Sequence, residues 1–318
     1  MDREMMPAWP GADAEPAVAR ALGLAAGSSR RAPHLIVEAA AAAGFGFVDL
    51  RVRPASAAAA GVGPLAGTPE SRRTLTALAG TGLRVEDVGG LVVDPACRAG
   101  DWRATLAAAA ALGARTVSVV LRDGDAGRRR DTLAALTEDA LSFALVPTLR
   151  AEPGSVLGIG AAAELAREVG CLVLPDSARW PREAPDVSDV AVRLHLADAA
   201  RRSRHAAPAD TEALLLPGDG HLDLAGFLAR FPAWLPVTVA LPERGGAASP
   251  GAGGTANADG ALAAACREAY AALRASLEAA GWPQTLRPPR AERPRSRPPY
   301  DEAHDPSRSG RRHGRRRP

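Results

Sequence analysis

The sequence contains no lysine, few aromatic residues and only three cysteines. Without lysine, no side-chain amine can form a Schiff base with a carbonyl substrate. Aromatic residues make up 4% of the chain, which leaves little for stacking against nucleic-acid bases. Cys97, Cys171 and Cys266 are far apart and odd in number, so they predict neither a disulfide framework nor a CxxC metal motif. We interpret them as small buried residues in a reducing compartment.

Long apolar runs and the best-known catalytic motifs are also absent. No run reaches the roughly 18 apolar residues of a membrane span, and the N-terminal segment has no apolar core of a secretory signal. We therefore expect a cytoplasmic protein with no membrane contact. No strand is followed by GxGxxG or GxxxxGKS/T, so no phosphate-cradling loop is predicted. The motifs GxSxG and HExxH do not occur either.

The C-terminal part of the chain differs in charge from the rest. The whole chain carries a net charge of +3, yet residues 283–318 contain eleven arginines against four acidic residues. The preceding residues are therefore mildly acidic. This tail also has eight prolines and almost no large apolar side chains, so we predict that it is disordered. We expect weak, salt-sensitive contacts with polyanions; a nucleic-acid-binding arm is the alternative.

Short apolar segments alternate with amphipathic ones along most of the chain. The predicted strands are Ala21–Ala26, Phe45–Val52, Leu83–Val93, Arg115–Leu121, Ala144–Leu149, Cys171–Leu174, Val190–Leu196 and Pro236–Leu241. The predicted helices are Pro33–Gly44, Thr68–Gly82, Asp101–Ala114, Arg128–Phe143, Val156–Gly170, His221–Phe231 and Ala258–Gly281, with a weak helix between the sixth and seventh strands. Thr68 and Asp101 are the expected N-caps of their helices.

This alternation predicts an α/β protein with a parallel sheet covered by helices. Eight units over about 260 residues match a closed (β/α)8 TIM barrel. A doubly wound open sheet is the competing fold, and the missing phosphate loops argue against it. We expect three parts: a flexible leader at 1–16, the barrel at 17–282 and the disordered tail at 283–318.

Polar residues stand where the predicted strands end, which is where a barrel of this kind carries its active site. They are Asp49, Arg51 and Arg53 after the second strand, Arg150 and Glu152 after the fifth, Asp176 after the sixth, His195 and Asp198 at the seventh, and Glu243 and Arg244 after the eighth.

Several segments resemble the xylose isomerase-like barrel superfamily of sugar-phosphate isomerases and epimerases. They are GFGFVDLRVRP, TLTALAGTGLRVEDV, LAAAAALGARTVSVV, VRLHLADA, and LLPGDGHLDLAGFLARF followed by PVTVALP. The last includes that family's Pro-Gly-x-Gly-x-x-Asp loop, here with Gly218, Gly220 and Asp223. The resemblance implies a (β/α)8 barrel, a sugar or sugar phosphate as the partner, and a role for Gly218 and Gly220 in binding it. The loop could instead be only a tight turn with Asp223 as the N-cap of the next helix.

The resemblance also implies a divalent metal site. The family takes a glutamate from the fifth strand, an aspartate from the sixth, a histidine from the seventh and a glutamate from the eighth, and such ligands suit Mn²⁺ or Mg²⁺. The metal would hold two substrate oxygens while acidic groups move a proton between adjacent carbons. Here His195 matches, and Asp176 matches with a shift of one residue. Arg150 and Ala240 stand in place of the two glutamates, and Gly89 replaces another glutamate usual near the end of the third strand.

A displaced ligand set is one way to restore such a site. Glu152 and Glu243 would join Asp176 and His195 and act in acid–base catalysis, since Glu152 shares a strand face with Arg150. They lie roughly 7–10 Å from the usual positions if the backbone is extended. That shift is large against a metal–ligand bond of about 2.1–2.2 Å.

The sequence therefore leaves three hypotheses for the function. The first is a sugar or sugar-phosphate isomerase or epimerase that uses a metal. The second is a catalytically silent barrel that binds an anionic small molecule through Arg150 and Arg51, because guanidinium groups suit carboxylates and phosphates. The third is a nuclease-like relative, which the acidic barrel and the missing histidine-rich metal site disfavour.

Overall fold

The computed structural model describes residues 18–19, 21–26, 31–52, 67–151, 154–200, 214–241 and 255–286. The compact unit Ala19–Leu286 holds the predicted barrel. Its eight main strands are β2 (Leu22–Ala25), β3 (Phe47–Arg51), β4 (Arg84–Val93), β5 (Thr116–Leu121), β6 (Val146–Arg150), β7 (Leu172–Leu174), β8 (Leu194–Leu196) and β11 (Val237–Ala240). Each of the eight lies within or at the edge of a predicted strand.

These strands form one parallel sheet that closes into a ring. Their order is β7-β6-β5-β4-β3-β2-β11-β8, and every neighbouring pair is parallel. Parallel bridges from Val173 to Ala191 and from Asp176 to His195 join β7 to the segment of β8. The α/β prediction of a (β/α)8 barrel is therefore confirmed, and the open doubly wound sheet is excluded.

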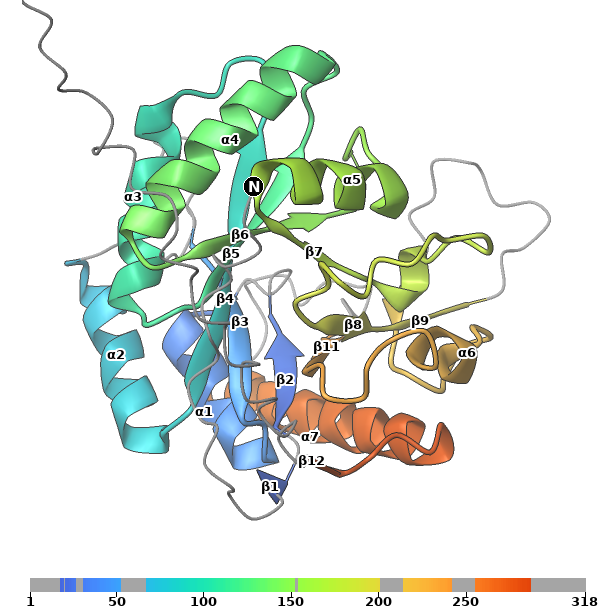
Figure 1. The fold of residues 1–318 in the computed structure, drawn as a ribbon. Helices are drawn as coiled ribbons and strands as arrows, with labels where there is room; N and C mark the ends of the chain where they lie inside the picture. The colour runs from blue at the N-terminus through green and yellow to red at the C-terminus, as the bar shows by residue number, and fades with distance from the viewer. Residues whose placement is uncertain are drawn as a thin grey trace, which may run out of the picture. The chain divides into compact units, whose positions relative to one another are not determined.

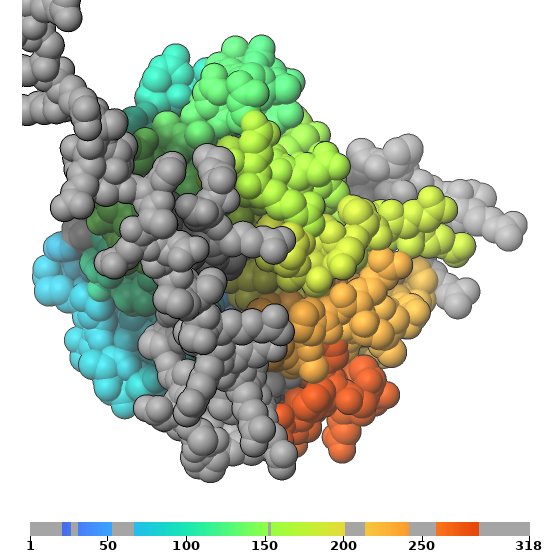
Figure 2. All heavy atoms as spheres, viewed as in Figure 1, coloured from blue at the N-terminus to red at the C-terminus, as the bar shows by residue number. Residues whose placement is uncertain are grey.

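A helix follows seven of the eight main strands and covers the outside of the barrel, and a short 3-10 turn follows β7 (Figure 1). In chain order these are α1 (Pro33–Ala43), α2 (Pro69–Thr81), α3 (Ala99–Ala111), α4 (Ala126–Ser142), α5 (Ile159–Val169), the 3-10 turn η1 (Ser177–Arg179), α6 (Leu224–Leu228) and α7 (Thr255–Ala279). On the face shown in Figure 2, residues 214–241 lie between the segment 154–200 and α7. None of the helices in the described parts of the chain is long and apolar enough to cross a membrane.

The helix starts show how local sequence sets these boundaries. Thr68 caps α2 as predicted, and its Oγ1 accepts a hydrogen bond from the Ser71 amide at 3.1 Å. Asp223 caps α6 in the same way through Gly226 at 2.8 Å. The prediction for Asp101 is wrong, because α3 begins two residues earlier and the Asp101 carboxylate accepts from the Arg98 amide instead. The predicted helix His221–Phe231 is shorter than expected, since residues 221–223 are irregular and the helix ends at Leu228, before a turn.

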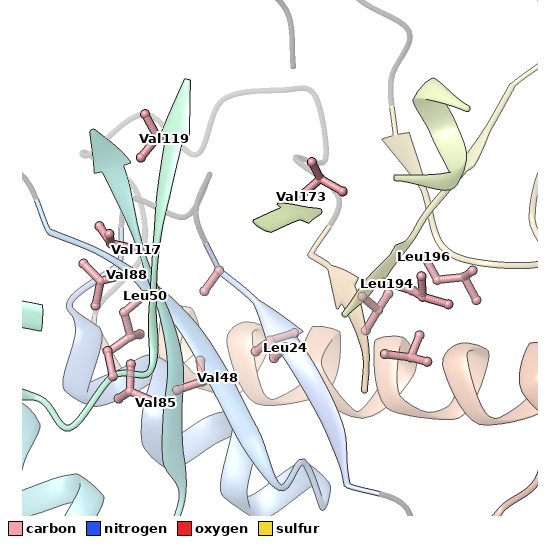
Figure 3. Close-up of a cluster of buried hydrophobic side chains, with 14 of the residues drawn as sticks. Leu24, Val48, Leu50, Val85, Val88, Val117, Val119, Val173, Leu194 and Leu196 are labelled. Carbon is pink, nitrogen blue, oxygen red and sulfur yellow. The ribbon is translucent and has the colours of Figure 1, made fainter. Parts of the chain in front are cut away.

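The apolar core lies between the strands and the helices. Alternate side chains of each strand point outward into this layer, including Leu24, Val48, Leu50, Val117 and Leu194 (Figure 3). The other set of side chains points into the barrel and is largely polar or small. At Gly23 on β2, the space that a Cβ would fill is taken by the ring of Phe47. The barrel therefore gains its stability from its outer layer and leaves the inside for charged groups.

The remaining strands are short. They are β1 (Val18–Ala19), β9 (Asp198–Ala199), β10 (Leu214–Leu215) and β12 (Thr285–Leu286), and β9 pairs with β10 antiparallel. The predicted leader 1–16 and nearly all of the tail 283–318 lie outside the described residues. The description ends at residue 286, four residues past the predicted end of the barrel.

Candidate functional site

A completely buried arginine organises the inside of the barrel. Arg193 lies directly before β8 and is 0% exposed. Its Nη2 atom lies 3.3 Å from Oδ2 of Asp49 on β3 and 3.3 Å from Oδ2 of Asp87 on β4. Its Nη1 atom donates to the Thr116 hydroxyl at 3.0 Å. One cation thus faces two carboxyl groups in a region from which water is excluded.

The two carboxyl groups differ in their partners. Asp87 accepts hydrogen bonds from the hydroxyls of Thr116 at 2.6 Å and Ser118 at 2.5 Å. In contrast, Oδ1 of Asp49 is buried and has no hydrogen-bond partner among the described residues. Asp87 is therefore the better stabilised as a carboxylate, because hydrogen bonds to an ionised group favour that form.

The surroundings of Asp49 favour its protonated form. Burial raises the pKa of Asp49 to about 7. The nearby Asp87 and Glu86 add to this rise, whereas Arg193 and Arg150 oppose it. A carboxyl group with a pKa near neutrality can both give and take a proton, as acid–base catalysis requires.

Asp49 lines a small cavity at the carboxyl ends of five consecutive strands. The cavity has a volume of about 20 Å³, enough for one water molecule. Its lining consists of Ala25, Asp49, Leu50, Arg51, Asp87, Gly89, Gly90, Ser118, Val120 and Arg150. The β3–β4 register shifts next to Asp49, and the β4–β5 register shifts across Gly89 and Gly90. Such bulges redirect side chains and are common beside active sites.

Arg51 and Arg150 end β3 and β6 and face this cavity together. Both were expected to bind substrate, and the structure brings them to one place. Arg150 also lies close enough to Asp49 and Asp176 to favour the ionised form of both. Arg150 therefore contributes positive charge at the position where the family resemblance placed a glutamate ligand.

Asp176 and His195 lie next to each other, as the sequence predicted. His195 Nδ1 is 3.2 Å from Asp176 Oδ2, and the same oxygen accepts from Arg179 Nη1 at 2.6 Å. The other oxygen, Oδ1, accepts from the Ala178 amide at 3.0 Å. Burial opposes ionisation of Asp176, but His195, Arg179 and Arg150 outweigh it and hold the pKa well below its usual range. Asp176 is therefore a carboxylate with both oxygens engaged.

These residues do not fit a divalent metal ion. Within the described parts of the chain, no group of three or more histidine, cysteine, aspartate or glutamate side chains is placed to hold one. Asp176 is paired with a cation, and Arg150 adds a second positive charge nearby. Of the side-chain nitrogen and oxygen atoms of Asp176 and His195, only His195 Nε2 is buried without a hydrogen-bond partner among the described residues. Glu152 and Glu243, the other members of the displaced set, lie outside the described residues, as do Arg53 and Arg244.

The loop with Gly218 and Gly220 is organised by Asp198 on β9. The Asp198 carboxylate accepts from the amides of Ala199 at 2.8 Å, Leu222 at 3.0 Å and Gly218 at 3.1 Å. Burial opposes ionisation of Asp198, but these amides and that of Gly220 outweigh it and lower its pKa. A Cβ at Gly220 would collide with the Asp198 carboxylate and with the carbonyl oxygen of Ala199. The geometry of the turn therefore accounts for glycine at positions 218 and 220, and the role of Gly218 and Gly220 in substrate binding stays a prediction.

Sequence reasoning missed Asp87, Ser118 and Arg193. Each lies inside an apolar stretch that was interpreted only as a buried strand. The available signal was a charged residue in the middle of such a stretch, because an unpaired buried charge is too costly to be retained. That signal predicts a partner, but it does not say which strand supplies it.

The comparisons with known proteins agree with this architecture. No protein-family model and no curated protein matches the sequence. Among solved structures, a xylose isomerase-like TIM barrel/4-hydroxyphenylpyruvate dioxygenase fusion protein matches with a TM-score of 0.60 at 20% identity, over 84% of this chain and 45% of that one. The IolI protein with a bound zinc atom matches with a TM-score of 0.56 at 14% identity, over 82% of this chain and 97% of that one. D-psicose 3-epimerase, solved in the presence of D-fructose, matches with a TM-score of 0.57 at 16% identity, over 82% and 99%.

This protein is a (β/α)8 barrel, because its eight parallel strands form a ring and charged side chains gather at their carboxyl ends. Within that class, its fold is the xylose isomerase-like TIM barrel, which it shares with sugar epimerases. The resemblance found in the sequence is confirmed at the level of the fold.

Proposed function

We propose that this protein binds a small anionic sugar, such as a sugar phosphate or a sugar acid, at the carboxyl ends of β2 to β6. The observation that carries the proposal is that Arg51, Arg150, Asp49 and Ser118 meet around one small cavity at these strand ends. Since the cavity has room for about one water molecule, it can take a single oxygen atom of the ligand and not the whole sugar. Carboxyl ends of barrel strands are where such folds bind their ligands. The guanidinium fork matches a phosphate or carboxylate group, and a carboxyl group can bind sugar hydroxyls.

The guanidinium groups at the cavity support an anionic ligand over a neutral one. Arg51 and Arg150 both line the cavity, where they can donate hydrogen bonds to an anionic oxygen. Burial raises the pKa of Asp49 to about 7, which lowers the negative charge that Asp49 presents to an incoming anion near neutral pH.

Thermal unfolding with a set of probes tests this proposal. D-fructose 6-phosphate and D-gluconate should raise the melting temperature of the wild type more than D-fructose does, since only the first two carry an anionic group. Arg150→Met should lose this difference, because it removes the guanidinium and keeps an apolar stem. Arg103→Met, at an ion pair on the outside of the barrel, is the control and should respond like the wild type. Equal stabilisation by the neutral sugar, or an unchanged response in Arg150→Met, would contradict the proposal.

A metal-assisted isomerase or epimerase is the second candidate, supported by the zinc atom bound to IolI, whose fold is similar. The described residues favour the metal-free alternative, because Arg150 and Arg179 surround the position of Asp176. Metal analysis of the purified protein separates the two. We expect no stoichiometric Mn, Mg or Zn and no change in melting temperature when Mn²⁺ is added. Stoichiometric metal that is lost in His195→Ala would establish the metal-assisted candidate instead.

A further inference from the structure

Asp49 is distinguished from the other buried acids by what surrounds each of its oxygens. Oδ2 lies 3.3 Å from Arg193 Nη2, in an ion pair with that guanidinium group. Oδ1 has no hydrogen-bond partner among the described residues, although Asp49 is only 5% exposed. A buried polar atom without a partner is costly, and such atoms in folded proteins need an explanation. A ligand that completes the hydrogen bond provides one.

The cavity beside Asp49 is lined in part by residues with little or no side chain. Ala25, Gly89 and Gly90 contribute little or no side chain to its lining. Gly90 has φ 122°, and a Cβ there would lie 2.8 Å from the carbonyl oxygen of Val52. That backbone conformation excludes other residues at position 90. The backbone conformation at Gly90 therefore keeps the space beside Asp49 free of a side chain from this position.

The charged groups around Asp49 divide into two sets. Asp87 and Glu86 repel a negative charge on Asp49, whereas Arg193 and Arg150 attract one. Asp87 accepts hydrogen bonds from two hydroxyls and lies beside Arg193. Arg193 cannot neutralise both aspartates at once, so a proton in this cluster resides on the less solvated carboxyl group. That group is Asp49.

The geometry points to Asp49 as the catalytic acid–base residue of this site, which exchanges a proton with a carbon atom next to the carbonyl group of a bound sugar. This inference rests on the proposed function. In the forward step, the Asp49 carboxylate takes the proton from carbon, and the C–H electron pair forms the carbon–carbon double bond of an enolate. Negative charge develops on the former carbonyl oxygen, where the Arg51 and Arg150 guanidinium groups stabilise it. Asp49 then returns the proton to the adjacent carbon, while the hydroxyl proton on the first carbon moves to the former carbonyl oxygen and the C–O bond there becomes the new carbonyl. This completes an aldose–ketose isomerisation with no net change in oxidation state.

Arg193 and Asp87 are positioning residues in this scheme. Arg193 lies on the side of Asp49 that faces away from its unpartnered oxygen, and it orients the carboxyl group. Asp87 competes for the same guanidinium and so prevents Arg193 from fully neutralising Asp49. Together they hold a carboxyl group that changes between its two protonation states at neutral pH, the condition under which acid–base catalysis is most efficient.

Solvent hydrogen exchange tests the inference with D-fructose 6-phosphate as the probe. In D2O, the wild type should replace hydrogen with deuterium at a carbon next to the carbonyl group, as observed by proton NMR. The rate should rise with pH through the titration of Asp49, because its carboxylate form removes the proton. Asp49→Asn should bind the probe within about threefold of the wild type in a thermal-shift titration and lose at least 100-fold in exchange rate. Asp139→Asn, which alters an ion pair on the outside of the barrel, should exchange at the wild-type rate.

The outcomes separate this inference from the proposed function. Wild-type protein that binds the probe but exchanges no hydrogen contradicts the role of Asp49 and leaves the binding function intact. Exchange that persists in Asp49→Asn also overturns it. If no anionic sugar binds to the wild type, the proposed function fails and this inference fails with it. Infrared spectra give a readout without substrate: the carbonyl band of a protonated carboxyl group should be present at pH 5, absent at pH 9, and missing at both in Asp49→Asn.

Discussion

Replacing Asp49 with asparagine should remove most of the change in stability of this protein between about pH 4 and pH 8. Burial raises the pKa of Asp49 from its ordinary value of 3.8 to about 7. The folded protein therefore binds this proton more tightly than the unfolded chain does. Where the folded state holds more protons, the free energy of unfolding falls as the pH rises. The contribution of Asp49 is fully present below about pH 4 and is lost by about pH 8.

The structure sets the size of the effect. Each unit of pKa corresponds to about 1.4 kcal/mol, so the rise from 3.8 to about 7 corresponds to about 4 kcal/mol over the whole window. Asparagine has nearly the same shape as the protonated acid and stays neutral at every pH. The variant should therefore resemble the wild type at or below about pH 4 and be the more stable of the two at pH 8. Asp176 and Asp198 have lowered pKa values, so their contributions are lost only at lower pH.

Urea unfolding followed by tryptophan fluorescence at several pH values from 5 to 8.5 measures this directly. The chain has five tryptophans, which report the transition. Asp139→Asn is the control and should keep the wild-type slope across this window. A wild-type stability that stays level or rises from pH 5 to pH 8 would refute the assignment of the proton to Asp49. An equal slope in wild type and Asp49→Asn would refute it as well.

Three other substitutions and one chemical treatment test the packing described above. Gly220→Ala should destabilise the protein by about 1–3 kcal/mol, because the new methyl group meets the Asp198 carboxylate. Gly80→Ala in α2 should stabilise the protein by up to about 1 kcal/mol, because a Cβ there meets nothing within 4 Å. Chemical unfolding of the two variants measures both changes. Arg193→Met should cost about 3–5 kcal/mol in the same assay at pH 8, because it leaves two buried carboxyl groups without their cation, and a loss below about 1 kcal/mol would contradict the ion pairs. Iodoacetamide should modify Cys97 first in the folded protein, as mass spectrometry can show, since burial raises the pKa of the other two thiols to about 12 and about 11.

The order of strands and helices could be predicted from the sequence because local patterns determine it. Apolar strands such as Phe47–Arg51 and capped helices such as Pro69–Thr81 carry their own signals, since periodicity, proline and N-caps act within a few residues. The number of units then indicated a closed barrel. The expectation that cysteines are small buried residues also holds for Cys171 and Cys266, whereas Cys97 is partly exposed. The Asp101 error is of the same local kind, a shift of a helix start by two residues.

The partners of the charged residues were decided only by the tertiary structure. The sequence by itself determined that Asp49, Arg150 and His195 lie at strand ends, but it could not show that Arg193, from a strand on another side of the ring, lies between Asp49 and Asp87. Such contacts join residues more than a hundred positions apart, and no local preference encodes them. Which carboxyl group keeps a proton follows from the surroundings that the closed barrel creates, since burial and neighbouring charges set the cost of ionisation. Barrel closure also brings His195 beside Asp176, whereas the pairing of Asp176 with Arg179, three residues further along the chain, is local. Together these contacts occupy the carboxylate that a metal ion would need.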